Sequence, residues 1–152
     1  MKTFSAFILL TFFNMHVSFA GQPPENEQKI IRNFLTYITA PKWSIDTVVS
    51  KYVVFYSEES KVASRAKRKF YLSMAVTELA QAAKNVKINE LKITPYDDAD
   101  EKLQIMVLGP EYRERSFVVT DSSGKFVRYF LIKDDQIESF VLFQNKAYLL
   151  LN

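Results

Sequence analysis

The pattern of apolar residues changes its period once along this chain, near Val86, and that change limits the folds the chain can adopt. Before this point apolar side chains recur every three or four residues, which is typical of amphipathic helices. After it, short runs rich in β-branched and aromatic residues are separated by short polar turns, which is typical of antiparallel strands. Helices followed by strands predict an α+β fold, in which two or three N-terminal helices pack on a curved antiparallel sheet of five to six strands.

The first two helical segments have clear boundaries. Apolar residues at helical spacing predict a first helix from Glu25 to Thr39, which Pro41 ends. Ser44 is suited to cap a second segment, because its hydroxyl oxygen can accept a free backbone N–H. The β-branched residues between Tyr52 and Tyr56 leave that stretch open to either a helix end or a short strand.

A third, long helix is predicted from Glu58 to Lys84, with Ser57 as its N-cap. The second half of this helix carries apolar residues at positions that surround most of its circumference. A helix that is apolar all round is buried on several sides. We therefore expect this helix to be covered by more than one part of its surroundings.

Six strands are predicted after this helix, joined by turns short enough to connect antiparallel neighbours. They run from Val86 to Thr94, Lys102 to Leu108, Glu114 to Thr120, Lys125 to Lys133, Gln136 to Phe143 and Lys146 to Leu151.

The two-residue turn Asp134-Asp135 predicts a hairpin whose register places apolar residues on both faces. The pairing includes Ile132 with Ile137 and Arg128 with Val141. One face then holds residues such as Phe126, Phe130 and Ile137, and the other holds residues such as Tyr129, Leu131 and Phe140. Because the helices cover only one face, we expect the other to meet a ligand pocket or a dimer partner.

Two arginines stand out on these strands. If the turn from Asp121 to Gly124 joins Thr120 to Lys125, Phe117 lies opposite Arg128 and Arg115 lies opposite Phe130. The two guanidinium groups then become diagonal neighbours on an aromatic wall, and such a pair can hold a carboxylate, phosphate or sulfate. The predicted ligand-binding residues are Arg115, Arg128, Phe117, Phe126 and Phe130. The alternative is that both arginines lie at the rim of the sheet, where they stack on aromatic rings or pair with Glu111 and Glu114.

The first twenty residues have the features of a secretory signal peptide. Lys2 precedes an apolar run from Phe4 to Phe13, and the small residues Ser18 and Ala20 stand at the positions that define a cleavage site. The sequence therefore predicts a signal peptide at 1–20, a single domain at 21–152, and export to a bacterial periplasm or the cell exterior. The apolar run is too short to span a bilayer, and we expect no membrane anchor.

Composition excludes several chemistries from the predicted mature domain. The chain has no cysteine, and its single histidine, His16, belongs to the predicted signal peptide. Serine–histidine triads, cysteine–histidine pairs and the common zinc sites are therefore ruled out, and we expect neither a cofactor nor a metal. The acidic run from Asp97 to Glu101 lacks the spacing of a calcium-binding loop. The formal net charge of +3 is too small to indicate nucleic-acid binding.

Residues 125–143, KFVRYFLIKDDQIESFVLF, resemble the closing hairpin of NTF2-like (SnoaL-type) cone-shaped α+β domains. In those domains a strand, a tight acidic or glycine turn, an isoleucine and a final strand follow one another. The leading helices and the length of the predicted domain are also similar. The resemblance implies a conical sheet around an apolar pocket, and it transfers no catalytic residue. Such folds host isomerases, ligand-binding proteins and protein-binding modules alike.

These observations favour binding over catalysis. We expect an exported ligand- or protein-binding domain whose concave sheet face takes a small apolar or anionic ligand, or the surface of a partner protein. One alternative is a small acid–base enzyme of NTF2-like type, with Glu78 as the candidate acid because it lies among apolar residues of the third helix. Another is a structural homodimer that packs through its sheet face.

Overall fold

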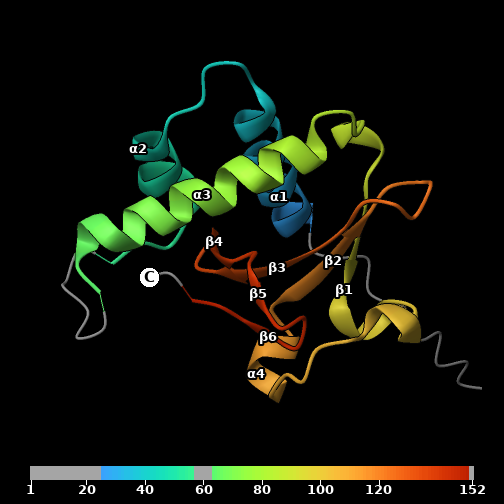
Figure 1. The fold of residues 1–152 in the computed structure, drawn as a ribbon. Coiled ribbons are helices and arrows are strands. Elements are labelled where there is room, and N and C mark those ends of the chain that lie inside the picture. The colour runs from blue at the N-terminus through green and yellow to red at the C-terminus, as the bar shows by residue number, and fades with distance from the viewer. Residues whose placement is uncertain (1–24, 57–62, 151–152) are drawn as a thin grey trace, which may run out of the picture.

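The computed structural model describes residues 25–56 and 63–150. The predicted signal peptide and the predicted helix cap at Ser57 lie outside these ranges. Within them the chain is α+β, as predicted, with N-terminal helices packed against a four-stranded antiparallel sheet and with a separate two-stranded sheet (Figure 1). The strands therefore form two sheets, where the sequence predicted one.

The first helical segments follow their local signals. Helix α1 spans Glu25–Thr39, the predicted range. Ser44 caps α2, Ile45–Thr47, by accepting the backbone N–H of Thr47, and the chain continues as a π-helical turn, Val48–Tyr52. The ambiguous stretch after Tyr52 is extended, since Val53 forms a parallel bridge with Ile137 of the sheet.

Helix α3 spans Arg65–Ala83 and begins later than predicted. Its cap is Ser64, whose backbone is extended and whose hydroxyl oxygen accepts the N–H of Lys67. Along one side of α3, Leu72, Val76 and Leu79 are buried in the main core. In the described ranges, none of the helices is both long and apolar enough to cross a membrane.

The strands of the larger sheet lie in the order in which they occur along the chain. They are β1 Lys92–Pro95, β2 Ser116–Thr120, β3 Val127–Lys133 and β4 Gln136–Ser139, and the smaller sheet pairs β5 Leu142–Phe143 with β6 Ala147–Tyr148. The turn between β3 and β4 has positive φ at Asp134 and Asp135, 48° and 61°, which is type I′ geometry. This turn pairs Ile132 with Ile137, as predicted.

The prediction of a strand from Lys102 to Leu108 is wrong. This stretch begins with a 3-10 turn, Glu101–Leu103, and continues as irregular chain towards the short helix α4, Pro110–Arg113. Tyrosine side chains bond several of its backbone groups, and the N–H of Val107 donates to the carbonyl of Lys146. The Tyr96 hydroxyl donates to the Met106 carbonyl and accepts the Met106 N–H, while the Tyr129 hydroxyl donates to the Leu103 carbonyl.

The first predicted strand, Val86 to Thr94, is also shorter than expected. Residues Ile88–Glu90 form a 3-10 turn, and only the final part of the predicted strand enters β1. The guanidinium group of Arg32 on α1 donates to the carbonyls of Ile88 and Leu91, at 2.6 Å each. Arg32 therefore bonds backbone carbonyls that would pair with a neighbouring strand if the predicted strand began at Val86.

The predicted strand from Gln136 to Phe143 breaks after Ser139. Between the pairs Ile132–Ile137 and Leu131–Ser139, β4 contains one extra residue, Glu138, and this bulge shifts the register so that Arg128 does not pair with Val141. The Ser139 hydroxyl donates to the carbonyl of Leu149 at 2.7 Å, which ties the end of β4 to the C-terminal segment.

The bulge also changes which face Phe140 occupies. An inserted residue reverses the in-and-out alternation beyond it. Phe140 consequently lies on the helix side, with its ring 5.5 Å from that of Phe34 and 6.3 Å from that of Phe130. The predicted position of Phe140 on the opposite face, with Tyr129, is therefore wrong.

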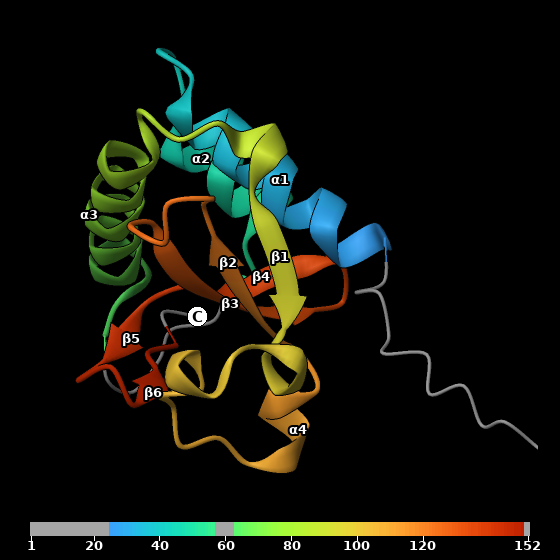
Figure 2. The same cartoon turned by 90° about the vertical axis from the view of Figure 1, so that its right-hand side faces the viewer.

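Both faces of the larger sheet are covered by segments of the same chain. Helices α1 and α3 lie on one side, and α4 with the β5–β6 hairpin lies on the other (Figure 2). A second core, formed by Tyr96, Met106, Val118 and Tyr129, fills the side away from the helices. From the sequence we expected a ligand or a dimer partner to cover the sheet face away from the helices. In the structure, other segments of the chain cover that face.

Candidate binding groove

Arg115 lies just before β2 and acts as the partner of a buried carboxylate. Its Nη1 donates to Glu138 Oε2 at 2.7 Å and to the carbonyl of Ile132 at 3.0 Å, and its Nε donates to the carbonyl of Glu111. The side chain of Glu138 is only 8% exposed. The guanidinium also lies over the ring of Tyr112, at 5.5 Å. Arg115 therefore stacks on an aromatic ring, as the alternative expected, but its ion-pair partner is Glu138 and not Glu111 or Glu114.

Arg128 lies elsewhere on the sheet, because the predicted register between β2 and β3 is wrong by two residues. Thr120 pairs with Val127 and Phe117 pairs with Phe130. The physical reason is the loop after β2. The carboxylate of Asp121 accepts the N–H of Phe126, and Gly124 adopts φ 69°, so the loop extends to Phe126.

The two arginines are consequently not diagonal neighbours. The carbonyl of Arg115 accepts the N–H of Ile132, and Arg128 lies opposite Val119. The four residues from Arg128 to Ile132 correspond to about 13 Å along a strand. Arg128 stacks on the ring of Phe126 at 5.2 Å and donates to the carbonyl of Val127. One anion therefore cannot bridge both guanidinium groups.

The three predicted aromatic site residues belong to the main core. Phe117, Phe126 and Phe130 are 3%, 5% and 0% exposed. They pack with the helices, as the edge-to-face contact of Phe130 with Phe34 illustrates. The geometry provides no common site for the five predicted residues, and their role in ligand binding stays a prediction.

The candidate acid Glu78 on α3 is exposed. A general acid with a raised pKa needs a buried carboxyl group. The prediction that Glu78 is a buried acid is therefore wrong, because its carboxylate is at the surface.

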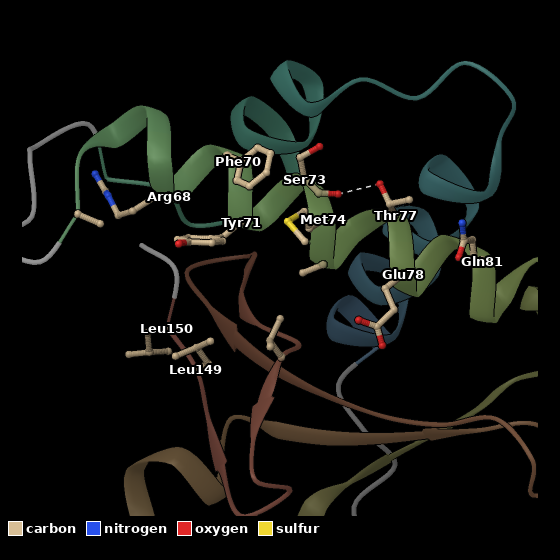
Figure 3. A pocket seen from close by; sticks show the side chains of 13 residues that line it. Arg68, Phe70, Tyr71, Ser73, Met74, Thr77, Glu78, Gln81, Leu149 and Leu150 are labelled. Carbon is tan, nitrogen blue, oxygen red and sulfur yellow. Dashed lines mark hydrogen bonds between the residues drawn. The ribbon is translucent and has the colours of Figure 1, made fainter.

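The structure reveals an apolar groove that was not predicted, between α3 and the C-terminal segment (Figure 3). Its volume is about 960 Å³. Phe70, Tyr71 and Met74 line it from α3, and Leu149 and Leu150 line it from the opposite side. The exposed fractions are 61% for Phe70, 57% for Met74 and 45% for Tyr71, and about two fifths for each leucine.

The groove forms because α3 has apolar residues on two sides. Leu72 and Val76 face the core, and Phe70, Tyr71 and Met74 lie on the side left uncovered. Its other wall is fixed by backbone contacts. The N–H of Leu149 donates to the carbonyl of Val141 at 2.8 Å, and the Leu149 carbonyl accepts the hydroxyl of Ser139. The expectation that this helix is covered on several sides is therefore wrong, because Phe70 and Met74 are more than half exposed. The apolar circumference of the predicted helix included these residues, but the sequence did not indicate that they line a groove.

Charged groups flank the apolar part of the groove on α3. Lys67 is exposed, and its Nζ lies 6.0 Å from the centre of the Tyr71 ring. Glu78 lies three helical turns further along and lines the groove. A smaller crevice of about 450 Å³ adjoins the groove, since both share Ala75, Glu78 and Val141, and Arg128 lines that crevice.

Comparisons with known proteins give no match for this chain among protein families, curated proteins or solved structures. The resemblance of residues 125–143 to the closing hairpin of NTF2-like domains therefore stays a prediction. The case for function depends on the groove itself.

Proposed function

We propose that this chain is an exported binding domain whose binding surface is the groove between α3 and the C-terminal segment. The observation that carries the proposal is the concentration of exposed apolar residues there. Of the nine large apolar side chains exposed among the described residues, five line this one groove. Soluble monomers rarely leave a contiguous apolar patch of this kind uncovered unless it binds something. Export is proposed from the signal-peptide pattern of residues 1–20.

An open groove with partly exposed walls suits the apolar surface of a protein better than a small ligand. Small-molecule sites enclose most of the ligand surface, whereas Phe70 and Met74 are more than half exposed. The acid–base alternative has less support. Glu78 is exposed, and Glu138, the buried carboxylate among the described residues, already pairs with Arg115.

An amphiphilic naphthalene sulfonate dye tests the groove in dilute protein. The dye should brighten with the wild type and bind at least about tenfold more weakly to Met74→Gln, because an amide in the groove would have to lose its water when the dye binds and brings no charge that could pair with the sulfonate. Val107→Gln is the matched control, since Val107 is 81% exposed and lies outside the groove lining. Equal dye binding by Met74→Gln and the wild type would contradict the proposal.

The same assay tests the sequence prediction for Arg128. The dye carries a sulfonate, so a role for Arg128 in anion binding requires weaker binding by Arg128→Ala. Unchanged binding by Arg128→Ala, together with loss in Met74→Gln, would assign the affinity to the apolar groove alone.

A further inference from the structure

We propose that the partner in the groove is a second copy of this chain, with the two α3 helices packed antiparallel about a two-fold axis. This inference rests on the proposed function, since it assigns a partner to the same surface. Symmetric dimers with a self-complementary patch are the commonest soluble oligomers.

The exposed face of α3 has the spacing of a helix-pairing seam. Lys67, Tyr71, Met74 and Glu78 follow one another at intervals of four, three and four residues, which is heptad spacing. All four are exposed in the structure. The opposite side of α3 is already buried in the core, so this seam is the side that a second helix can reach.

The charges on this seam select the antiparallel orientation. With the two-fold axis between Leu72 and Ser73, Lys67 of one copy lies opposite Glu78 of the other, and the pair occurs twice. A parallel arrangement would place Lys67 opposite Lys67 and Glu78 opposite Glu78, and like charges repel. The antiparallel orientation also sets the two helix dipoles head to tail. No other charge lies on the seam between Lys67 and Glu78.

The apolar residues are complementary in the same register. Tyr71 of each copy lies opposite Met74 of the other, and contacts between a thioether sulfur and an aromatic ring are favourable. The register that pairs the charges therefore also pairs the residues between them.

The exposed area is of the size that a dimer needs. Large side chains have areas of roughly 150–250 Å², so the exposed fractions of Phe70, Tyr71, Met74, Leu149 and Leu150 amount to about 450 Å² per copy. A standard interface buries about 800 Å² per partner, with a polar rim. The apolar groove accounts for more than half of that area, and the polar residues of α3 beside the groove would form the polar rim of the interface.

Charge reversal tests the pairing. Sedimentation velocity should show the mature wild-type chain as a dimer, and Lys67→Glu and Glu78→Lys should each weaken the dimer roughly ten- to thirtyfold, because each turns two attractive pairs into repulsive ones. An equimolar mixture of the two variants should dimerise like the wild type. The glutamate introduced at 67 then faces the lysine introduced at 78, and the unchanged Glu78 of the first variant faces the unchanged Lys67 of the second. Native mass spectrometry, with one variant carrying a mass tag, identifies the mixed dimer.

Two controls keep the outcome clear. Lys87→Glu reverses a charge in an exposed ion pair outside the seam, with Glu90 at 3.0 Å, and should leave the dimer unchanged. Circular dichroism should show all variants folded, because the substituted side chains are exposed. A wild type that stays monomeric, or a mixture of Lys67→Glu and Glu78→Lys that fails to pair, overturns the proposal.

The dye assay separates this inference from the proposed function. A monomeric wild type that binds the dye in a Met74-dependent manner overturns self-pairing and leaves the groove as a binding surface for a different partner. A chain that neither dimerises nor binds the dye through the groove overturns both.

Discussion

Two residues of α3, Leu72 and Met74, provide a direct test of which side of the helix belongs to the fold and which side is free to bind. They are two positions apart on one helix, so their backbone surroundings are closely matched. Leu72 is 1% exposed, whereas Met74 is 57% exposed. We compare Leu72→Ala with Met74→Ala.

The two substitutions differ in the apolar contact that they remove. Leu→Ala at a fully buried site costs about 3–5 kcal/mol, because it loses the transfer free energy and leaves a cavity. Met74 has less than half of its side chain buried, so its truncation costs roughly 1 kcal/mol or less. Alanine is also a slightly better helix former than methionine, which offsets part of that cost. The variants should differ by at least about 2 kcal/mol, which is about 8 °C in Tm for a domain of this size.

Urea denaturation followed by far-ultraviolet circular dichroism measures this difference in dilute protein. The slope of the free energy of unfolding against urea should be the same for both variants, because neither alters the surface exposed on unfolding much. Equal losses of stability for Met74→Ala and Leu72→Ala would refute the reasoning, since the outer face of α3 would then be part of the folded core.

Two further predictions concern pH and export. Burial raises the pKa of the Tyr148 hydroxyl above its ordinary value of 10.0. The folded state therefore holds this proton more tightly than the unfolded state, so the associated stability is present below about pH 10 and is lost as the pH rises above it. Denaturation across pH 9–11.5 should show a smaller loss for Tyr148→Phe than for the wild type, and equal losses would contradict this assignment. Separately, the mass of the exported protein should place its N-terminus at Gly21, as the small residues Ser18 and Ala20 predict; an intact Met1 would argue against cleavage there.

Features with local causes could be predicted from the sequence. The spacing of Ile31, Phe34 and Leu35 with a stop at Pro41 gave the bounds of α1, and Ser44 caps the next helix. The Asp134-Asp135 turn has the type I′ geometry that two-residue hairpins require. Each of these signals acts over a few residues, so the sequence contains all of the interacting groups next to one another.

Features that depend on distant contacts could not be predicted in the same way. The segment 102–108 was expected to be a strand, but the Tyr96 hydroxyl takes the backbone groups of Met106. The separation of Arg115 from Arg128 follows from the loop that the Asp121 carboxylate holds. In both places side chains bond backbone groups that a strand ladder would otherwise use, and in the segment 102–108 the bonding groups are distant in the sequence.

The order of helices and strands was enough to predict the α+β class, since apolar periodicity is a property of each segment. It also indicated that α3 has apolar residues on more than one side. The groove depends in addition on Leu149 and Leu150, which a bulge in β4 and the Ser139–Leu149 hydrogen bond place opposite that helix. The two walls of the groove lie 75 to 80 residues apart in the sequence, from Met74 and Phe70 to Leu149 and Leu150. The candidate binding surface is therefore a product of tertiary packing.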